Sequence, residues 1–201
     1  MRNPIPRLVP TLAAALLLTA TANATTFVVR PGGDTKVVFV SRAPTETFEG
    51  RTDRMRGRLD VEPAAVGDSI TVHMEVDMAS LDTGLAKRNQ HMLENHLETK
   101  KYPKAIFDGA AVLGPARARL APGQTTVFEA EGTFTLHGVS RRLRINVAAA
   151  YDARGQGGRI SFQTTFPVLL PDYQISRPQF LFLKLAESQE VRVKGIATVS
   201  P

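Results

Sequence analysis

Apolar and polar residues alternate with a period of two along most of this chain. In residues 69–78 the even positions are apolar and the odd positions are polar. A strand places successive side chains on opposite faces of its sheet, so this pattern predicts strands with one buried and one solvated face. The same alternation recurs in residues 54–62, 126–137, 142–152, 159–166 and 190–199.

About eight strands emerge once residues 37–39 and 105–113 are added, and turns rich in proline and glycine separate them. One solvated face per strand argues against a parallel sheet covered by helices on both sides. The predicted fold class is therefore mainly β and antiparallel. A closed barrel and a sandwich both fit the alternation, which does not choose between them.

Two segments depart from the strand pattern. In the first, about residues 83–98, Leu85, Met92, Leu93 and Leu97 follow helical spacing and predict one amphipathic helix. Either Asp82 or Thr83 can cap its start, and Pro103 stops it. In the second, about residues 167–189, Pro171 and Pro178 exclude a regular central strand. We expect it to form a long connection that folds over the body or lines a barrel mouth.

The first 24 residues have the features of an export signal. Arg2 and Arg7 precede a mostly apolar run, and Ala22-Asn23-Ala24 forms a small-x-small cleavage site. A membrane anchor is the alternative, but the run falls short of the roughly 20 residues that a spanning helix needs. We therefore expect cleavage after Ala24, a periplasmic or secreted protein, and a single domain over residues 25–201.

Composition narrows the possible partners. The chain has no cysteine, so disulfides and thiolate chemistry are excluded. Its formal net charge is +6, but the basic residues are scattered and have few aromatic neighbours. A nucleic-acid groove combines both, so no nucleic-acid partner is expected. No segment after the leader is long and apolar enough to span a membrane.

The residues that carry chemistry are few. His73 and His137 fall on polar strand faces and are expected to be exposed, whereas His91 and His96 are five residues apart. Two zinc ligands on one helix need a separation of three or four, so no metal site or cofactor is expected. The chain lacks a nucleophile elbow and a phosphate-binding loop. No enzymatic activity is therefore predicted.

The inward strand face mixes large and small apolar residues. Phe128, Phe134 and Phe162 share it with Gly57 and Gly132. Eight strands can close around side chains alone, so the mixture is compatible with a filled core. It is equally compatible with a ligand cavity, and the pattern leaves the two open.

Several short segments, in order, resemble a known family. These are Ser80–Gly84, Arg88–Met92, Lys101–Phe107, Gly132–Gly138 and Asp172–Ile175. In their order and spacing they resemble the YceI-like family of exported lipid-binding proteins. Within them, Asn89 replaces a usual aspartate and Gln174 stands where glycine is common.

The resemblance implies an antiparallel eight-stranded lipocalin-like barrel with an apolar cavity for an isoprenoid or similar long-chain lipid. It also implies a homodimer, which the residue pattern does not require. Arg88 and His91 are candidates for a lipid head group, although Arg88 also fits a role as a bridge from helix to barrel. The candidate lining residues are Phe39, Phe48, Met74, Met78, Leu93, Phe107, Phe128, Phe134, Phe162 and Phe180.

The expected function is non-enzymatic binding of such a lipid, for transport, storage or sensing. Two alternatives remain beside it. One is a ligand-free periplasmic stress-response or interaction protein with a filled barrel. The other is a lipid-modifying enzyme, which needs an ionisable group inside the cavity.

Overall fold

The computed structural model describes residues 24–44, 46–66, 70–113, 119–154, 157–177, 179–180 and 183–200. The predicted leader falls almost wholly outside these ranges. The strands are β1 (Thr25–Val29), β2 (Lys36–Arg42), β3 (Thr47–Thr52), β4 (Met55–Val61), β5 (Ile70–Asp77), β6 (Lys104–Leu113), β7 (Thr125–Leu136), β8 (Val139–Asp152), β9 (Arg159–Leu169), β10 (Gln179–Phe180), β11 (Leu183–Lys184) and β12 (Ser188–Val199). The helical elements are η1 (Pro63–Ala65), η2 (Met78–Ser80), α1 (Ala86–His91), η3 (Met92–His96) and η4 (Leu170–Tyr173).

Ten of these strands form one antiparallel sheet that closes on itself. Its order is β1-β4-β5-β6-β7-β8-β9-β12-β2-β3, and an additional β1–β12 pairing closes it. One edge of β12 pairs with β2 through residues 190–194 and with β1 through residues 197–199. β1 and β2 therefore share one barrel position and β3 and β4 the next, which gives the closed barrel of eight positions that was predicted.

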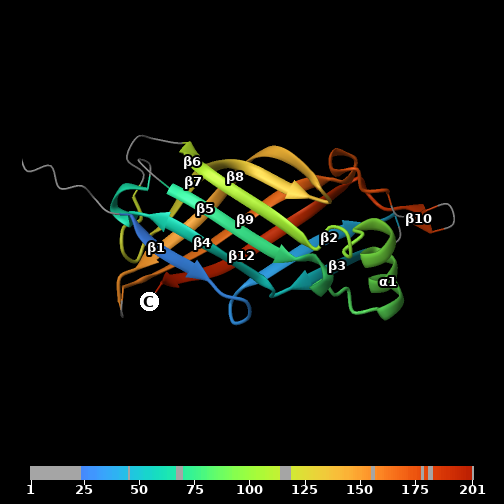
Figure 1. The fold of residues 1–201 in the computed structure, drawn as a ribbon, viewed down its shortest axis with the longest axis horizontal. Helices are drawn as coiled ribbons and strands as arrows, with labels where there is room; N and C mark the ends of the chain where they lie inside the picture. Colours follow the sequence, from blue (N-terminus) through green and yellow to red (C-terminus); the bar gives the residue numbers. More distant parts are fainter. Residues whose placement is uncertain are drawn as a thin grey trace, which may run out of the picture.

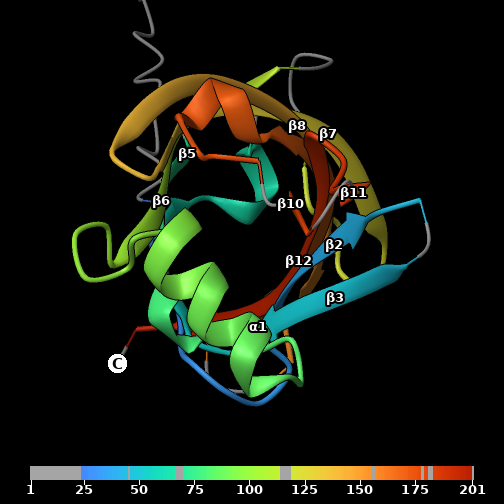
Figure 2. The same ribbon diagram turned by 90° about the vertical axis from the view of Figure 1, so that its right-hand side faces the viewer.

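The helical segment lies at one end of this barrel. Figure 1 shows α1 beside β2 and β3 at the right-hand end, and Figure 2 looks onto that end, with α1 in front of the strands. The edge of β3 is covered here, because Arg51 and Asp82 exchange two backbone hydrogen bonds of 2.9 and 3.0 Å. Covering the edge satisfies backbone groups that would otherwise be open to another chain.

The helix itself is shorter than the predicted 83–98. Regular α-helix covers only Ala86–His91, and it continues as the π-helical turn η3. Neither Asp82 nor Thr83 caps its first amides, and the residue at the cap position, Leu85, makes no side-chain cap. Asp82 instead accepts from the Gly84 N–H at 2.8 Å, so its carboxylate closes the turn before the helix.

The closing connection is also shorter than predicted. β9 extends to Leu169 and β12 begins at Ser188, so strand pairing takes up the expected ends of the 167–189 segment. Pro167 is tolerated inside β9 on an exposed outward position. Between the two strands lie η4 and the short hairpin β10–β11.

The core consists of two clusters of buried apolar side chains. One lies toward the barrel end away from α1 and includes Phe27, Met55, Val61 and Leu120. The other lies under α1 and η4; Met78, Phe166 and Tyr173 belong to it, with Met92, Leu93 and Leu97 packed against it. The amphipathic segment therefore packs Met92, Leu93 and Leu97 on the end of the barrel, as its helical spacing predicts. Leu85 is 56% exposed, so its predicted place on the buried face is wrong.

Candidate functional site

An apolar cavity runs along the barrel axis between the two core clusters. Its volume is about 140 Å³. This is close to a well-known engineered cavity of roughly 150 Å³ that stays dry and binds benzene. Strands β4 to β9 and β12 supply its walls. The lining residues are Met55, Leu59, Val61, Val66, Ile70, Val72, Met74, Val76, Ala105, Phe107, Gly109, Leu120, Phe128, Ala130, Glu131, Phe134, Ile145, Val147, Ala149, Ile160, Phe162, Thr164, Phe166 and Val193.

Glycines in the wall explain why large and small residues alternate on the inward face. The Phe107 ring lies over Gly109 and Gly132, where an added Cβ would be 2.8 and 2.7 Å from ring carbons. In the same way, the Phe162 ring lies over Gly195, at 2.7 Å from such a Cβ. A ring that occupies the space above a glycine lies closer to the wall than it could above a larger residue, which leaves more room near the axis. The barrel is therefore partly filled and retains a cavity.

The cavity contains almost no ionisable group. Glu131 is its one charged lining residue among those the structure describes. Its carboxylate pairs with Arg142 and Arg144, both exposed side chains of β8. The side chain therefore faces the outside of the barrel, and only its backbone borders the cavity. Such a wall can hold an apolar molecule through burial alone.

His137 joins the segments that cover the end of the barrel under α1. It is buried, with 9% of its surface exposed, so the expectation of an exposed histidine is wrong. Its Nε2 lies 2.8 Å from a Glu98 carboxylate oxygen, and its Nδ1 lies 3.1 Å from the Tyr173 carbonyl. The Tyr102 ring packs against it at 4.4 Å. The alternation of polar and apolar residues gave the wrong prediction because His137 lies in the β7–β8 turn, beneath segments that are distant in the sequence.

Backbone strain concentrates around this histidine. Glu98, His137 and Gln174 are the three residues other than glycine with positive φ in the described chain, at 43°, 51° and 55°. Gln174 directly follows Tyr173, and its left-handed backbone explains why glycine suits that position. Conformations of this kind cost free energy and persist only where the surroundings hold them. Here the hydrogen bonds of His137 supply part of that support.

The opening segment 80–89 is held by its own polar side chains. Asn89 Oδ1 accepts from the backbone N–H and the hydroxyl of Thr83 at 2.8 and 2.6 Å, and its Nδ2 donates to Asp82 at 2.7 Å. These contacts lower the pKa of Asp82, because the hydrogen bond from Asn89 favours the carboxylate. Asn89 therefore organises the turn that leads into α1.

Arg88 ties this segment to the β2–β3 hairpin. Its guanidinium donates to the Thr83 hydroxyl and carbonyl, both at 3.0 Å, and pairs with Glu46 at 2.8 Å. It also lies 3.9 Å above the centre of the Phe48 ring. These partners match the bridging role. His91 is exposed, and its Nδ1 lies 3.4 Å from Asn95 Nδ2.

The predicted lining residues fall into three groups. Met74, Phe107, Phe128, Phe134 and Phe162 line the cavity. The next group covers the end under α1: Met78 is buried there, while Phe39 and Leu93 pack against the same cluster. Phe48 meets Phe39 edge-to-face at 6.3 Å. Phe180 lies in β10, and its side chain is outside the described residues.

Several cavity residues were absent from that set. Met55, Ile145 and Phe166 lie on the apolar faces of their strands, so the alternation contained the signal for them. Val66 and Leu120 close the far end of the cavity from irregular segments. The Leu120 N–H donates to the Pro63 carbonyl at 2.7 Å, a contact that no periodicity reveals.

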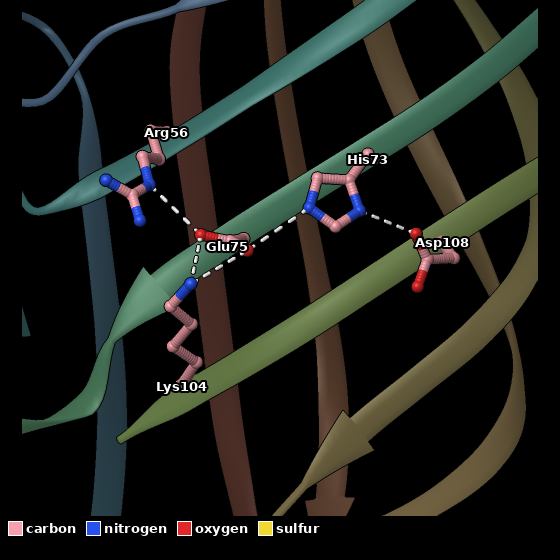
Figure 3. Close-up of polar contacts among 5 residues, drawn as sticks. All are labelled: Arg56, His73, Glu75, Lys104 and Asp108. Carbon is pink, nitrogen blue, oxygen red and sulfur yellow. Dashed lines mark hydrogen bonds and ion pairs between the residues drawn. The ribbon is translucent and has the colours of Figure 1, made fainter. Parts of the chain in front are cut away.

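A charged ladder crosses the outer face of β4, β5 and β6 (Figure 3). Glu75 accepts from Arg56 at 3.0 Å and from Lys104 at 3.0 Å, and these bonds, that from Lys104 foremost, lower its pKa to about 2. His73 Nδ1 lies 2.7 Å from an Asp108 oxygen, a bond that raises the pKa of His73. The ladder lies on the solvent side of the sheet, and we assign it to stability.

The described part of the chain contains neither a metal site nor a helix that could cross a membrane. No three histidine, aspartate or glutamate side chains there lie close enough to hold a metal ion. Nor does any helix within the described ranges have the length and apolar character needed to cross a membrane.

Fold and cavity together define a lipocalin-like barrel with an apolar interior. The family model of the YceI-like domain matches residues 27–197, so the chain belongs to the YceI-like family. A sequence search of curated proteins finds no match.

Solved structures show the same fold at low sequence identity. A polyisoprenoid binding domain from Saccharophagus degradans superposes with a TM-score of 0.67 at 19% identity, over 88% of this chain and 99% of that one. BcnA from Burkholderia cenocepacia gives 0.66 at 20% identity, over 82% and 96%. The YceI protein of Campylobacter jejuni gives 0.60 at 16% identity, over 76% and 84%.

Proposed function

We propose that the chain binds an isoprenoid or similar long-chain lipid inside the barrel, without chemical turnover, in the periplasm or outside the cell. The observation that carries the proposal is the axial cavity, whose walls are aliphatic and aromatic. Membership of the YceI-like family supports it. So does the structural neighbour from Saccharophagus degradans, which is described as a polyisoprenoid binding domain.

The energetics favour a tail-binding site. Burial contributes about 0.8 kcal/mol per CH₂, or up to roughly 4 kcal/mol per five-carbon unit. Association and ordering costs offset part of this gain. At about 140 Å³, the cavity takes one short apolar group in this conformation. A longer chain needs the flexible side chains of Met55 and Met74 to move, which methionine does at low cost.

The covered end under α1 is the proposed route for the lipid. Its cover consists of short segments that pack on the apolar cluster and are joined by polar contacts, among them His137 with Glu98 and His96 with Ser176 at 2.9 Å. The far end is closed by buried Val66 and Leu120. The helical residues Met92, Leu93 and Leu97 are only half-buried, whereas Val66 and Leu120 are 1% and 5% exposed, so we expect exchange at the α1 end.

Paired variants of β8 test the proposal. Ala149 lines the cavity at 3% exposure, whereas its neighbour Ala150 is not among the lining residues. Ala149→Leu places three more carbons in the cavity and displaces about two methylenes of ligand, which predicts at least roughly ten-fold weaker binding. Ala150→Leu is the matched control and should bind as the natural chain does. Native mass spectrometry with a series of isoprenoid alcohols measures both.

The outcomes separate the alternatives. Bound isoprenoid of unchanged mass that Ala149→Leu loses supports a binding protein. Ligand recovered as a shorter or altered product would indicate an enzyme. Absence of uptake by the natural chain at every length tested would contradict the proposal and favour a filled barrel, an alternative that the small cavity volume keeps open.

A further inference from the structure

A second hollow lies on the outside of the barrel, across the wall from the cavity. Its volume is about 560 Å³, within the roughly 300–1,000 Å³ typical of small-molecule sites. It crosses five neighbouring strands, β7, β8, β9, β12 and β2. The lining residues are Lys36, Val38, Val127, Asn146, Ala148, Gln163, Thr164, Thr165, Arg192, Val193 and Lys194.

Strand register orders these residues into a row with two different ends. Lys36 is paired with Lys194, Lys194 with Gln163, Gln163 with Ala148 and Ala148 with Val127. One end of the row is therefore cationic, the middle is an amide and the other end is apolar. Val127 is 66% exposed, an unusual position for a β-branched apolar side chain.

The cationic end carries a charge that the rest of the described chain does not neutralise. Lys36 and Lys194 face each other directly on adjacent strands, an arrangement that destabilises a sheet. Neither lysine forms an ion pair with any described carboxylate. Beside them, Arg192 pairs with Glu190 and with Glu49 at 3.5 Å.

Those two carboxylates are already shared among arginines. Glu190 also pairs with Arg42, and Glu49 with Arg51, both at 3.4 Å. Three guanidinium groups therefore compete for two carboxylates, which leaves an excess of one positive charge. The two opposed lysines add two positive charges that no ion pair of the described residues neutralises. An anion bound between the lysines would relieve their repulsion.

We infer that this outer groove binds a soluble phosphate monoester with a short apolar chain. The phosphate lies between Lys36 and Lys194, because lysine recognises phosphate as a compact point charge. Gln163 donates from its amide, and the apolar chain lies over Ala148 toward Val127. The site is separate from the barrel interior, so the inference does not depend on the proposed lipid function.

Calorimetric titration of the full chain with hexyl phosphate tests the inference. Lys36→Gln with Lys194→Gln removes both charges, and we expect at least roughly ten-fold weaker binding. The matched control replaces two exposed lysines of the helical segment, Lys87→Gln with Lys100→Gln, and should change affinity less than two-fold.

Ligand controls separate the two halves of the site. Inorganic phosphate should bind more weakly than hexyl phosphate, and hexanol should not compete for the groove. Affinity should fall as salt concentration rises, because the contact is a screened surface interaction. Loss of the opposed lysines should leave the melting temperature unchanged or raise it, which excludes misfolding as the cause of weaker binding.

Three results would overturn the inference. The first is the absence of heat with hexyl phosphate at millimolar concentration. The second is binding that survives the double lysine substitution unchanged, which would place the hexyl chain inside the barrel instead. Binding only to vesicles that contain phosphatidic acid, without binding of the soluble monoester, would also reject it in favour of a membrane surface.

Discussion

Two glycines of the barrel wall, Gly132 and Gly195, have different neighbours. We therefore expect replacement by alanine to affect stability differently at the two positions. At Gly132 an added Cβ would lie 2.5 Å from the Asp108 carbonyl oxygen and 2.8 Å from the Gly109 Cα. At Gly195 the nearest atoms are side-chain atoms, namely Phe162 Cζ at 2.7 Å and Met55 Cε at 3.1 Å. Gly132→Ala therefore forces backbone apart, whereas Gly195→Ala moves only side chains that border the cavity.

The magnitudes follow from the contacts. Overpacking against a backbone that cannot yield costs about 1–3 kcal/mol. Replacing glycine by alanine in a strand returns roughly 0.5–1 kcal/mol. Gly132→Ala should therefore lose about 1–2 kcal/mol, or roughly 2–8 °C in Tm for a domain of this size. Gly195→Ala should stay within about 0.5 kcal/mol of the natural chain and bind lipid more weakly, because Phe162 shifts into the cavity.

Urea unfolding followed by circular dichroism measures the stability difference, and native mass spectrometry measures lipid uptake. Equal stability of the two variants would refute the distinction between backbone and side-chain neighbours. Unchanged uptake by Gly195→Ala would refute the claim that Phe162 and Met55 set the free volume of the cavity.

Four further changes test the charged ladder and the covered end of the barrel. The pKa of Glu75 is about 2, against 4.5 for the free side chain, so the stability it contributes, about 1 kcal/mol, is present above pH 4.5 and lost as pH falls toward 2. Urea unfolding of Glu75→Gln across this pH range should show no such loss of stability. A variant that still loses this stability would contradict the assignment. The pKa of His73 is raised above 6.5, so the stability that it contributes is present below pH 6.5 and disappears as pH rises through the folded pKa. In His73→Gln the free energy of unfolding should therefore change less with pH in that window. His137→Asn, which tolerates positive φ, should lose about 1–3 kcal/mol and speed lipid exchange in a stopped-flow assay, whereas an unchanged rate would mean that the cover opens elsewhere. Arg88→Met should lose about 1 kcal/mol and leave lipid affinity within two-fold by native mass spectrometry; a large loss of affinity would restore Arg88 as a head-group ligand.

The barrel was predictable because each strand carries its own signal. Alternation in β4, β5, β7, β8, β9 and β12 identified the inward face, and five of the predicted lining residues do line the cavity. Closure was harder, since β1 and β2 share one position only through their separate pairings with β12. The order and spacing of the segments that resemble the YceI-like family indicated a barrel, whereas the alternation alone fitted a barrel and a sandwich equally.

The covered end shows where sequence reasoning stopped. His137 continues the polar face of its strand, yet it is buried because the turn lies under Glu98 and Tyr173, which are distant in sequence. Likewise, the free volume of the cavity depends on rings that lie over glycines of neighbouring strands. The mixture of large and small residues on the inward strand face was therefore equally compatible with a filled interior and with a cavity.

The location of the bound lipid tests the central claim most directly. The chain labelled with ¹³C at its methionine methyl groups, mixed with an unlabelled isoprenoid alcohol, reports proximity through intermolecular nuclear Overhauser effects. The structure predicts contacts from the isoprenoid to the methyl groups of Met55 and Met74, which line the cavity. Binding with contacts to Met92 on the helical segment alone, or to none of the methionines, would contradict an interior site.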